Sequence, residues 1–402
     1  MTHCSHRVRV LYSFPHKLGA DRICYTAWQQ VNGLAAAGAD VLVCCGALLR
    51  AVPVDVRVDP TLSIGPFRIP PKLLGSNRAF ALHDYIVSKR LEAMQGQVDI
   101  VHTWPLGAAL TLKTAARLDI PTVLERPNAH TQFAMDAVRL ECERVGVVLP
   151  ANHEHSHNSA KLRIEEEEYR LADRLLCPSD FVVGTFLEKG FPRDKLQRTQ
   201  YGFDPLVCHP NGRTRNVGRG FTMMFVGGCA PRKGLHYALQ AWLASPAHID
   251  GTFLIAGAFV PGYAEKLNDM LRHSSVRVLG HRKDVPDLMR TADMLVLPTV
   301  EEGSALVTYE ARGCGCVLLV SDAAGAVCTH MEDALVHQAG DVETLTQHIT
   351  LLHRNRSLLE KLRARSLSTA SQLTWSMAGV KLLQTYRDTI AARSPAFAVR
   401  TD

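Results

Sequence analysis

Aromatic residues and strong net charge are both scarce in this sequence. Only 6% of its 402 residues are Phe, Trp or Tyr, and the formal net charge is +6. Proteins that bind nucleic acids usually gather basic residues into a stripe, often with interleaved aromatic side chains on which bases stack. The composition therefore argues against a nucleic-acid partner. With 47% hydrophobic and 21% charged residues, it is typical of a soluble globular protein.

Paired cysteine motifs and a membrane-length apolar run are also missing. The eleven cysteines show no Cys-x-x-Cys spacing, and the first residues lack the pattern of a secretion signal. The most apolar stretch, residues 33–49, contains Asp40 and is interrupted by Gly38, so it does not make the ~20-residue apolar span that crosses a bilayer. We expect a cytoplasmic protein in a reducing compartment, with any membrane contact peripheral and at the inner face.

The sequence does contain a repeated alternation of strand and helix patterns. Residues 7–14 (RVRVLYSF) are rich in β-branched and aromatic residues, a helical pattern runs through Leu34, and residues 39–44 (ADVLVC) form a continuous apolar run. Such alternation predicts parallel sheets with helices on both faces. Further strands are predicted at 98–102, 121–124, 174–177, 221–226, 252–256, 276–279, 294–297 and 317–321, and helices at 108–118, 164–172, 235–243, 264–272, 285–290, from 305 and at 375–390.

A loss of periodicity divides the chain. Turn-forming residues gather at 205–219 without a helix or strand pattern. We predict a Rossmann-like acceptor-binding domain over 1–208, a Rossmann-like donor domain over 209–375, and a C-terminal helical segment over 376–402 that could pack back on the first domain. Two such domains would place the carboxyl ends of two parallel sheets across a cleft, where open α/β sheets bind ligands.

Two glutamates, Glu302 and Glu310, follow the predicted buried strand at 294–297. The first falls in a loop and the second within the next helix. Backbone amides between them would lie at a helix N-terminus, where unpaired N–H groups and the helix dipole favour a diphosphate. Glu310 could then accept hydrogen bonds from ribose hydroxyls, although an isolated pair of glutamates is more often an acidic cap and a solvated helix residue. The expected donor contacts in this block are Gly303, Ser304, Ala305, Leu306 and Glu310.

A second block, residues 225–234 (FVGGCAPRKG), follows the first strand of the second predicted domain. A glycine turn lets the backbone approach a phosphate, and Lys233 supplies a point charge for it. The alternative is a solvated lysine before a helix. The expected donor contacts in this block are Gly227, Gly228, Arg232 and Lys233.

Together these blocks resemble glycosyltransferase family 4 (glycosyl transferases group 1), the retaining enzymes of the GT-B fold. The stretch from Glu302 to Glu310 is similar to the family's E-x7-E block, and residues 225–234 are similar to its V-G-R-L-x-x-x-K-G segment. Weaker similarities lie at 172–179 and 201–204. Gly228 stands where the family has an arginine, which leaves Lys233 alone at the matched positions and puts the level of activity in doubt.

The resemblance also suggests residues in the first domain. Gly19 lies in the first strand-to-helix loop, where the family has a glycine-rich loop that admits the donor phosphates and the acceptor. His130 follows the predicted strand at 121–124, where the family carries a histidine near the transferred sugar, and Arg126 is a second candidate there. Without the resemblance, a single loop glycine is as often a turn residue, and a histidine at a strand end is as often structural.

The resemblance implies retaining transfer of a sugar from a nucleotide-diphosphate sugar to a hydroxyl of a glycan, a lipid-linked acceptor or a small metabolite. Glu302, Lys233 and His130 would be the catalytic residues, and no metal or other cofactor is expected. Two alternatives stay open: an epimerase or phosphorylase of the same fold, and a catalytically weak nucleotide-sugar-binding protein. A Rossmann dehydrogenase is disfavoured because no G-x-G-x-x-G follows the opening strand.

Three other patterns have simpler interpretations. His153, His155 and His157 alternate as metal ligands in a strand could, but their polar surroundings favour an exposed loop. The run from Glu165 to Glu168 predicts a solvated helix face. Residues 67–90 contain a basic, apolar loop and helix that could touch an anionic membrane surface holding a lipid-linked acceptor, or form an ordinary amphipathic helix.

Overall fold

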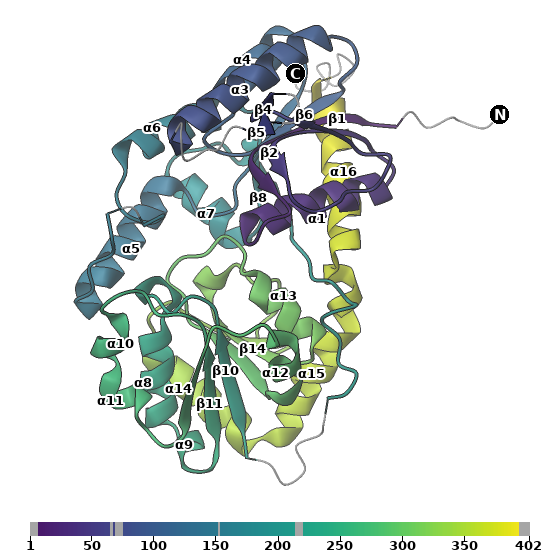
Figure 1. Cartoon of the computed structure of the whole chain (residues 1–402). Helices are drawn as coiled ribbons and strands as arrows, with labels where there is room; N and C mark the ends of the chain where they lie inside the picture. The colour runs from purple at the N-terminus through teal and green to yellow at the C-terminus, as the bar shows by residue number, and fades with distance from the viewer. Residues whose placement is uncertain (1–6, 65–66, 69–74, 152, 214–219, 394–402) are drawn as a thin grey trace, which may run out of the picture.

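The chain folds into two α/β domains, which stand one above the other in Figure 1, in a computed structural model. The structure describes residues 7–64, 67–68, 75–151, 153–213 and 220–393. Each domain is built on one parallel sheet with helices packed around it. The fold is therefore the one that the alternation of strand and helix patterns predicts.

The N-terminal sheet has the order β3-β2-β1-β6-β7-β8-β9, so the direction of winding reverses between β1 and β6. All its strand pairs are parallel. The strands are β1 (Arg9–Leu18), β2 (Asp40–Leu48), β3 (Arg57–Pro60), β6 (Ile100–Thr103), β7 (Thr122–Glu125), β8 (Arg174–Cys177) and β9 (Leu196–Arg198), and the helices are α1 (Ile23–Ala36), α3 (Ser76–Ala93), α4 (Ala109–Arg117), α5 (Thr131–Val145), α6 (Ser159–Leu171) and α7 (Asp180–Glu188).

The C-terminal sheet repeats this plan with the order β12-β11-β10-β13-β14-β15, and its winding reverses between β10 and β13. β13 and β14 are buried at every position, as expected of continuous apolar runs in a sheet covered on both faces. The strands are β10 (Thr222–Val226), β11 (Thr252–Ala256), β12 (Val276–Gly280), β13 (Met294–Leu297), β14 (Val317–Ser321) and β15 (Ala334–His337), and the helices are α8 (Leu235–Ala244), α9 (Ala247–Asp250), α10 (Tyr263–Lys266), α11 (Asn268–Leu271), α12 (Val285–Thr291), α13 (Leu306–Gly313), α14 (Val342–Arg354) and α15 (Arg356–Thr369).

Several elements differ from their predicted extents: β2 runs on to Leu48 and α6 begins at Ser159, and two further cases have a visible cause. β1 continues through Pro15 to Leu18, with an irregular register between Phe14 and Lys17. A proline has no N–H to give to the ladder, which explains the irregularity there. The helix predicted over 264–272 is divided at Leu267 into α10 and α11. Of the basic segment at 67–90, residues 69–74 lie outside the described residues, and the remainder includes most of α3.

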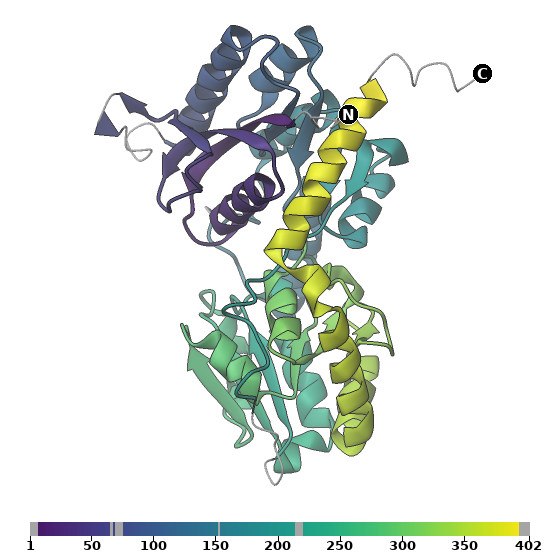
Figure 2. The ribbon, with the colours of Figure 1, turned by 90° about the vertical axis from the view of Figure 1, so that its right-hand side faces the viewer.

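A long C-terminal helix, α16 (Trp375–Arg393), leaves the C-terminal domain and runs along the N-terminal one (Figure 2). It crosses α1 at a pair of glycines, Gly33 and Gly379, whose backbones lie so close that a Cβ on Gly379 would collide with Gly33. Further along, the Tyr386 hydroxyl lies 2.5 Å from Nδ1 of His102 in β6. The helix therefore ties the two domains together. No helix in the described part of the chain has the length and apolar character needed to cross a membrane.

Candidate active site

Two loops meet at the point where the C-terminal sheet reverses its winding. One spans residues 227–234 after β10, and the other spans residues 298–305 after the neighbouring β13. The Val300 N–H and the Thr299 hydroxyl both donate to the carbonyl oxygen of Arg232, at 2.9 and 2.8 Å. Gly234 makes this approach possible, because any Cβ there would collide with the Pro298 carbonyl and its φ is +69°. The crevice at such a reversal is where open α/β sheets bind ligands.

The paired loops place two cations on one carboxylate. The Lys233 ammonium donates to Oε2 of Glu302, and Nη1 of Arg232 lies 3.2 Å from the same oxygen. Arg232 also donates to the carbonyl oxygen and to Oε2 of Glu301, at 2.8 and 3.1 Å. The side chains of Lys233, Glu302 and Arg232 are only 16%, 12% and 13% exposed, so water screens these charges weakly.

The local electrostatics follow from this burial and pairing. Burial alone would raise the pKa of Glu302, but Arg232 and Lys233 hold it at about 2. Burial lowers the pKa of Lys233, opposed by the Glu302 charge. Glu302 therefore stays ionised at neutral pH. A bound anion could exchange with it as the partner of the two cations.

The glycines of the first loop leave room beside this cluster. A Cβ added to Gly227 or Gly228 would meet no atom of the described residues within 4 Å, and Gly227 has a φ of +142°. Gly228, which replaces the family arginine, supplies no cation. The structure instead brings Arg232 next to Lys233 on Glu302, so a second cation lies in the cluster from a different position.

The second loop contacts the other domain. Gly303 lies so close to the Pro127 carbonyl that a Cβ would collide with it, and the Ser179 hydroxyl donates to the Gly303 carbonyl at 2.5 Å. Ser304 donates its hydroxyl to the Gly325 carbonyl, and the Ala305 amide donates to the Ala324 carbonyl. Helix α13 begins one residue later than predicted, at Leu306. At this helix start the N–H groups of Ala305 and Thr308 are therefore already paired, the second with the Ala305 carbonyl oxygen at 2.9 Å.

Glu310 lies on α13, partly buried, and burial raises its pKa. Burial raises the pKa of Tyr25 on α1, and the negative charges of Asp204 and Glu310 raise it further.

The structure places Arg126 and His130 inside the N-terminal domain. The Arg126 guanidinium lies 4.4 Å from the centre of the Tyr169 ring and 3.8 Å from a Glu165 oxygen. The His130 ring accepts the Gln132 N–H and packs on Tyr169, Phe186 and Phe191, with its pKa lowered to about 4 by burial and by Arg126. Within the described residues, every hydrogen bond and ring contact of His130 is made with its own domain, and none is made with the Lys233 cluster.

Gly19 lies at the end of β1, at a φ of +85°, where a Cβ would come within 2.6 Å of the Arg50 side chain. The turn that follows carries Arg22, whose φ of 59° is unusual for a residue with a side chain. Gly19 is thus required by the geometry of this turn.

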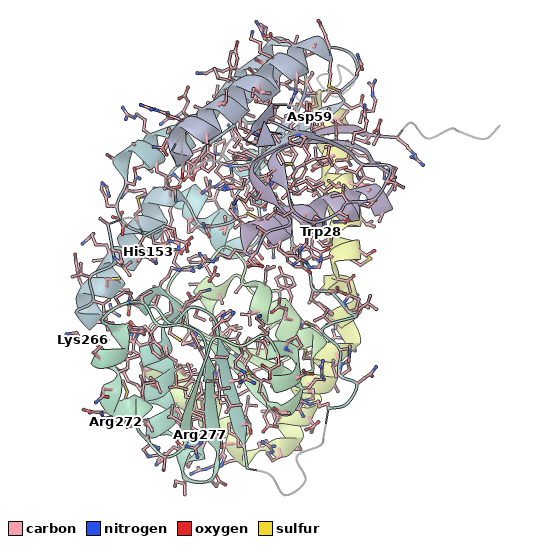
Figure 3. The ribbon with its side chains drawn as sticks, in the orientation of Figure 1. Trp28, Asp59, His153, Lys266, Arg272 and Arg277 are labelled. Carbon is pink, nitrogen blue, oxygen red and sulfur yellow. The ribbon has the colours of Figure 1, made fainter. Side chains whose placement is uncertain are left out.

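The segment around His153 is the loop that the sequence suggests, and among its described residues only His155 is buried. His155 is buried, whereas Glu154 is exposed, with Oε2 3.7 Å from Arg22 and Oε1 3.6 Å from His155. Glu154 has its pKa lowered to about 2, chiefly by His155 and further by Arg22 and Arg232. Figure 3 shows the labelled His153 at the level where the two domains face each other. The described residues contain no group of three or more His, Cys, Asp or Glu side chains arranged to hold a metal ion.

The predicted solvated face of α6 is wrong for two of its four glutamates. Glu165 and Glu168 are buried, and Glu168 accepts the N–H groups of Leu106 and Ala108, at 2.8 and 3.0 Å, at the start of α4. The acidic charge suits the positive end of that helix.

Sequence reasoning also missed Glu301 and Glu154. Glu301 is fully buried, and Oε1 accepts the Ala129 N–H across the domain boundary at 3.3 Å. Its position directly before Glu302 in the sequence could have indicated that Glu301 belongs to the same cluster. Nothing in the sequence around Glu154 indicates its proximity to Arg22 and His155.

Comparisons with known proteins agree with this architecture. Residues 220–355 match the family model for glycosyl transferases group 1, and residues 25–205 match the model for glycosyltransferase family 4. The O-antigen chain mannosyltransferase B of Escherichia coli is 25% identical over 258 residues, which are 61% of this chain and 65% of that protein. An N,N'-diacetylbacillosaminyl-diphospho-undecaprenol alpha-1,3-N-acetylgalactosaminyltransferase of Campylobacter jejuni is 28% identical over 29% of this chain and 32% of its own length. The chain thus spans less than two thirds of these relatives.

Solved structures show the same fold. HepE of Anabaena in complex with UDP matches with a TM-score of 0.65 at 16% identity, over 95% of this chain and 100% of that one. A sucrose-phosphate synthase from Thermosynechococcus elongatus matches with a TM-score of 0.68 at 16% identity, over 96% and 100%. With both domains matched by family models and the two-domain fold shared, this chain belongs to the GT-B glycosyltransferases of glycosyl transferases group 1 and glycosyltransferase family 4.

Proposed function

We propose that this protein is a retaining glycosyltransferase that moves a sugar from a nucleotide-diphosphate sugar to an acceptor hydroxyl. One observation carries the proposal: Lys233 and Arg232 converge on Glu302 beside the start of α13, at the winding reversal of the C-terminal sheet. The named transferase relatives and the UDP complex of HepE support a nucleotide-sugar donor. The acceptor would be a glycan, a lipid-linked saccharide or a small metabolite that approaches from the N-terminal domain.

The donor diphosphate would exchange with Glu302. Glu302 pairs with Lys233 and Arg232, and Arg232 also pairs with Glu301. A diphosphate in the open space beside Gly227 and Gly228 would take over these cations and accept hydrogen bonds from N–H groups at the start of α13. Positive groups fixed in advance around a leaving group stabilise the charge that develops there, which is usually the largest electrostatic contribution to catalysis.

The carboxylates would then bind hydroxyls. Glu302, released from Lys233, would hold hydroxyls of the transferred sugar, and Glu310 would hold those of the ribose. His130 and Arg126 would support the sugar from the N-terminal domain, and Gly19 would leave room for the phosphates and the acceptor. For His130 this role requires a shift of its domain or loop, because its ring contacts lie within its own domain.

Retention would follow from attack on the face that the leaving group occupies. The bond between the anomeric carbon and the diphosphate oxygen breaks, and a bond to the acceptor oxygen forms on the same face. The acceptor proton passes to the departing diphosphate, so atoms and charges balance. The cations that hold the diphosphate also keep this oxygen in place to receive the proton.

The experiment is a thermal-shift screen with UDP, GDP, ADP and their sugars, followed by transfer with the stabilising donor. A ligand at 100 times its Kd adds roughly 3 kcal/mol to stability, which raises the Tm of a protein of this size by several degrees. Proton NMR of the product then gives the anomeric configuration. Stabilisation followed by a product of retained configuration is the expected result.

Each other outcome contradicts a definite part of the proposal. Inverted configuration would exclude retention, and nucleotide binding without turnover across an acceptor panel would favour the nucleotide-sugar-binding alternative. If none of the nucleotides stabilised the protein, the proposed donor site would be wrong.

A further inference from the structure

A cavity of about 350 Å³ lies where the chain crosses between the two domains. One crossing begins at the end of β9 and lines the cavity with residues 198–200. The other is α16, which runs from the C-terminal domain along the N-terminal one (Figure 2) and lines the cavity between Ala378 and Thr385. None of the described lining residues belongs to the loops of the Lys233 cluster. A ligand in this cavity would contact both crossings.

Two cations line the cavity from different elements. Arg198 ends β9, and Lys381 lies on α16. The Lys381 ammonium donates to Oε1 of Gln200, a neutral group, at 2.6 Å. Burial lowers the pKa of Lys381, and the positive charge of Arg198 lowers it further. The two cations therefore repel each other, and an anion bound between them would relieve that repulsion.

The pairs that these cations already make leave the cavity positive. Among the described lining residues, the carboxylate that faces them is that of Asp180. Its Oδ2 lies 3.4 Å from Nε of Arg198, but the Asp180 side chain is 89% exposed, so water screens this pair strongly. Arg198 also donates to the carbonyl oxygen of Pro178 at 2.8 Å, which is a neutral acceptor. Two cations thus stand against one solvated carboxylate.

Two buried polar atoms at the cavity have no hydrogen-bond partner among the described residues. They are Nε of Arg198 and the hydroxyl oxygen of Thr199, and both residues line the cavity. Buried polar groups are nearly always hydrogen-bonded, so two unpaired ones beside two cations indicate a missing partner. A phosphate group accepts hydrogen bonds from a guanidinium and from a hydroxyl at the same time.

We propose that this cavity binds a phosphate group, carried by a small phosphomonoester or present as free phosphate, at a site separate from the donor diphosphate. Arg198 and Lys381 hold its oxygens, and Thr199 donates its hydroxyl. The cavity volume is at the lower end of the range for small-molecule sites, which suits a phosphate joined to a small polyol. Because the ligand contacts both crossings, it stabilises the domain arrangement described above. The inference goes beyond the proposed function and does not depend on it.

The test measures the Tm of the full chain against increasing inorganic phosphate, glycerol 3-phosphate and glucose 6-phosphate at constant ionic strength. Glycerol and glucose are the neutral counterparts. Since a phosphate could also bind the Lys233 cluster, each titration is repeated with Lys233→Met, which removes one cation of that cluster. At least one of the three phosphates should raise Tm to a plateau in both proteins, whereas glycerol and glucose at the same concentrations should not.

The first variant removes a charge from the cavity. Lys381→Met keeps most of the apolar stem but loses the ammonium, and it should weaken phosphate binding about 10-fold, as expected for a lost hydrogen bond between charged groups. Its matched control is Lys361→Met, which changes an exposed lysine on α15 outside the cavity lining and should bind phosphate as the wild type does.

The second variant separates a binding role of Thr199 from a structural one. Thr199→Val replaces the unpaired hydroxyl by a methyl group and keeps the backbone N–H that donates to the Cys177 carbonyl at 2.8 Å. It should weaken phosphate binding about 5-fold without lowering the Tm of the ligand-free protein, because no hydrogen bond within the protein is lost. Thr199→Ser keeps the hydroxyl and should bind phosphate as the wild type does.

The phosphate arms identify the source of the ligand. Tighter binding of an ester than of inorganic phosphate would identify a metabolite, equal binding would identify free phosphate, and both results agree with the proposal. The proposal would be overturned if no phosphate raised Tm, if the neutral compounds did so equally, if the effect vanished in Lys233→Met, or if Lys381→Met and Thr199→Val bound phosphate normally. Nucleotide stabilisation of the wild type tests the proposed function separately, so either conclusion can fail while the other stands.

Discussion

The two halves of this molecule share one architecture but assemble their functional groups differently. In the C-terminal half, Lys233 and Glu302 lie on loops that directly follow two adjacent buried strands, so the sheet topology brings them together. In the N-terminal half, Glu154 lies in a segment between two helices and its carboxylate is 3.7 Å from Arg22, which lies in a turn. Strand order alone therefore predicts the proximity of Lys233 and Glu302 but not that of Glu154 and Arg22.

The largest effect that separates the halves should come from Lys233→Met. If the C-terminal loops carry the leaving-group chemistry, this change removes a cation from the diphosphate and should lower kcat/KM by about 100- to 1,000-fold. The Met side chain keeps most of the apolar stem, so the folded structure should persist. Steady-state transfer kinetics with the identified donor measure the loss.

The matched control is Lys361→Met, which changes an exposed lysine on α15 and should leave transfer at the wild-type rate. Comparable activity of both variants would mean that Lys233 is not part of the diphosphate site. The C-terminal loops would then not carry the leaving-group chemistry.

A smaller effect should come from the contact between the halves. Gly303→Ala introduces a Cβ that collides with the Pro127 carbonyl, so the loop that carries Glu302 must shift away from the N-terminal domain. Displacements of about 1 Å near reacting groups cost up to about 100-fold in rate, and we expect a loss of about 10- to 100-fold in kcat with a lower Tm.

Gly184→Ala is the control for the same chemical change. Gly184 lies inside α7, and a Cβ there meets no described atom within 4 Å. An alanine in a helix interior is favoured over glycine by about 1 kcal/mol, so this variant should be at least as stable as wild type and fully active. An active, stable Gly303→Ala would show that the two domains do not need this close approach.

The sequence predicted the proximity of three residues in the C-terminal half because their positions follow from local rules. Buried strands appear as continuous apolar runs, and the residues directly after them must lie at one edge of the sheet. Arg232, Lys233 and Glu302 were therefore expected near one another, and the structure brings them together. Their roles in binding and catalysis remain predictions.

The N-terminal half shows what such rules leave out. Glu165 and Glu168 are three residues apart, so they share one face of α6, and tertiary packing turns that face inward toward Arg126 and the start of α4. A run of charges in the sequence does not reveal which helix face is buried. In the same way, no pattern around Glu154 indicates the domain that it faces.

The smallest effect concerns one buried acid in each half of the molecule, Glu302 and Glu125. Glu302 has a pKa lowered to about 2 despite its burial, because two cations contact it. Glu125, at the end of β7, is fully buried and accepts hydrogen bonds from Gln30 and Tyr201, and burial raises its pKa to about 7. The same kind of residue therefore contributes to stability with opposite dependence on pH.

For Glu125, the folded pKa lies above the unfolded value of 4.5, so its contribution is full below pH 4.5 and is lost as pH rises through 7. The loss is on the order of 3 kcal/mol. Glu125→Gln cannot ionise and should lose less stability than wild type between pH 5 and pH 8.5, a difference readable in Tm. Glu302→Gln should leave the change in stability between pH 4.5 and pH 7 unaffected, because the contribution of Glu302 to stability is lost as pH falls from 4.5 to 2. Parallel Tm profiles for wild type and Glu125→Gln between pH 4.5 and pH 7 would show that the carboxyl group is solvated rather than buried.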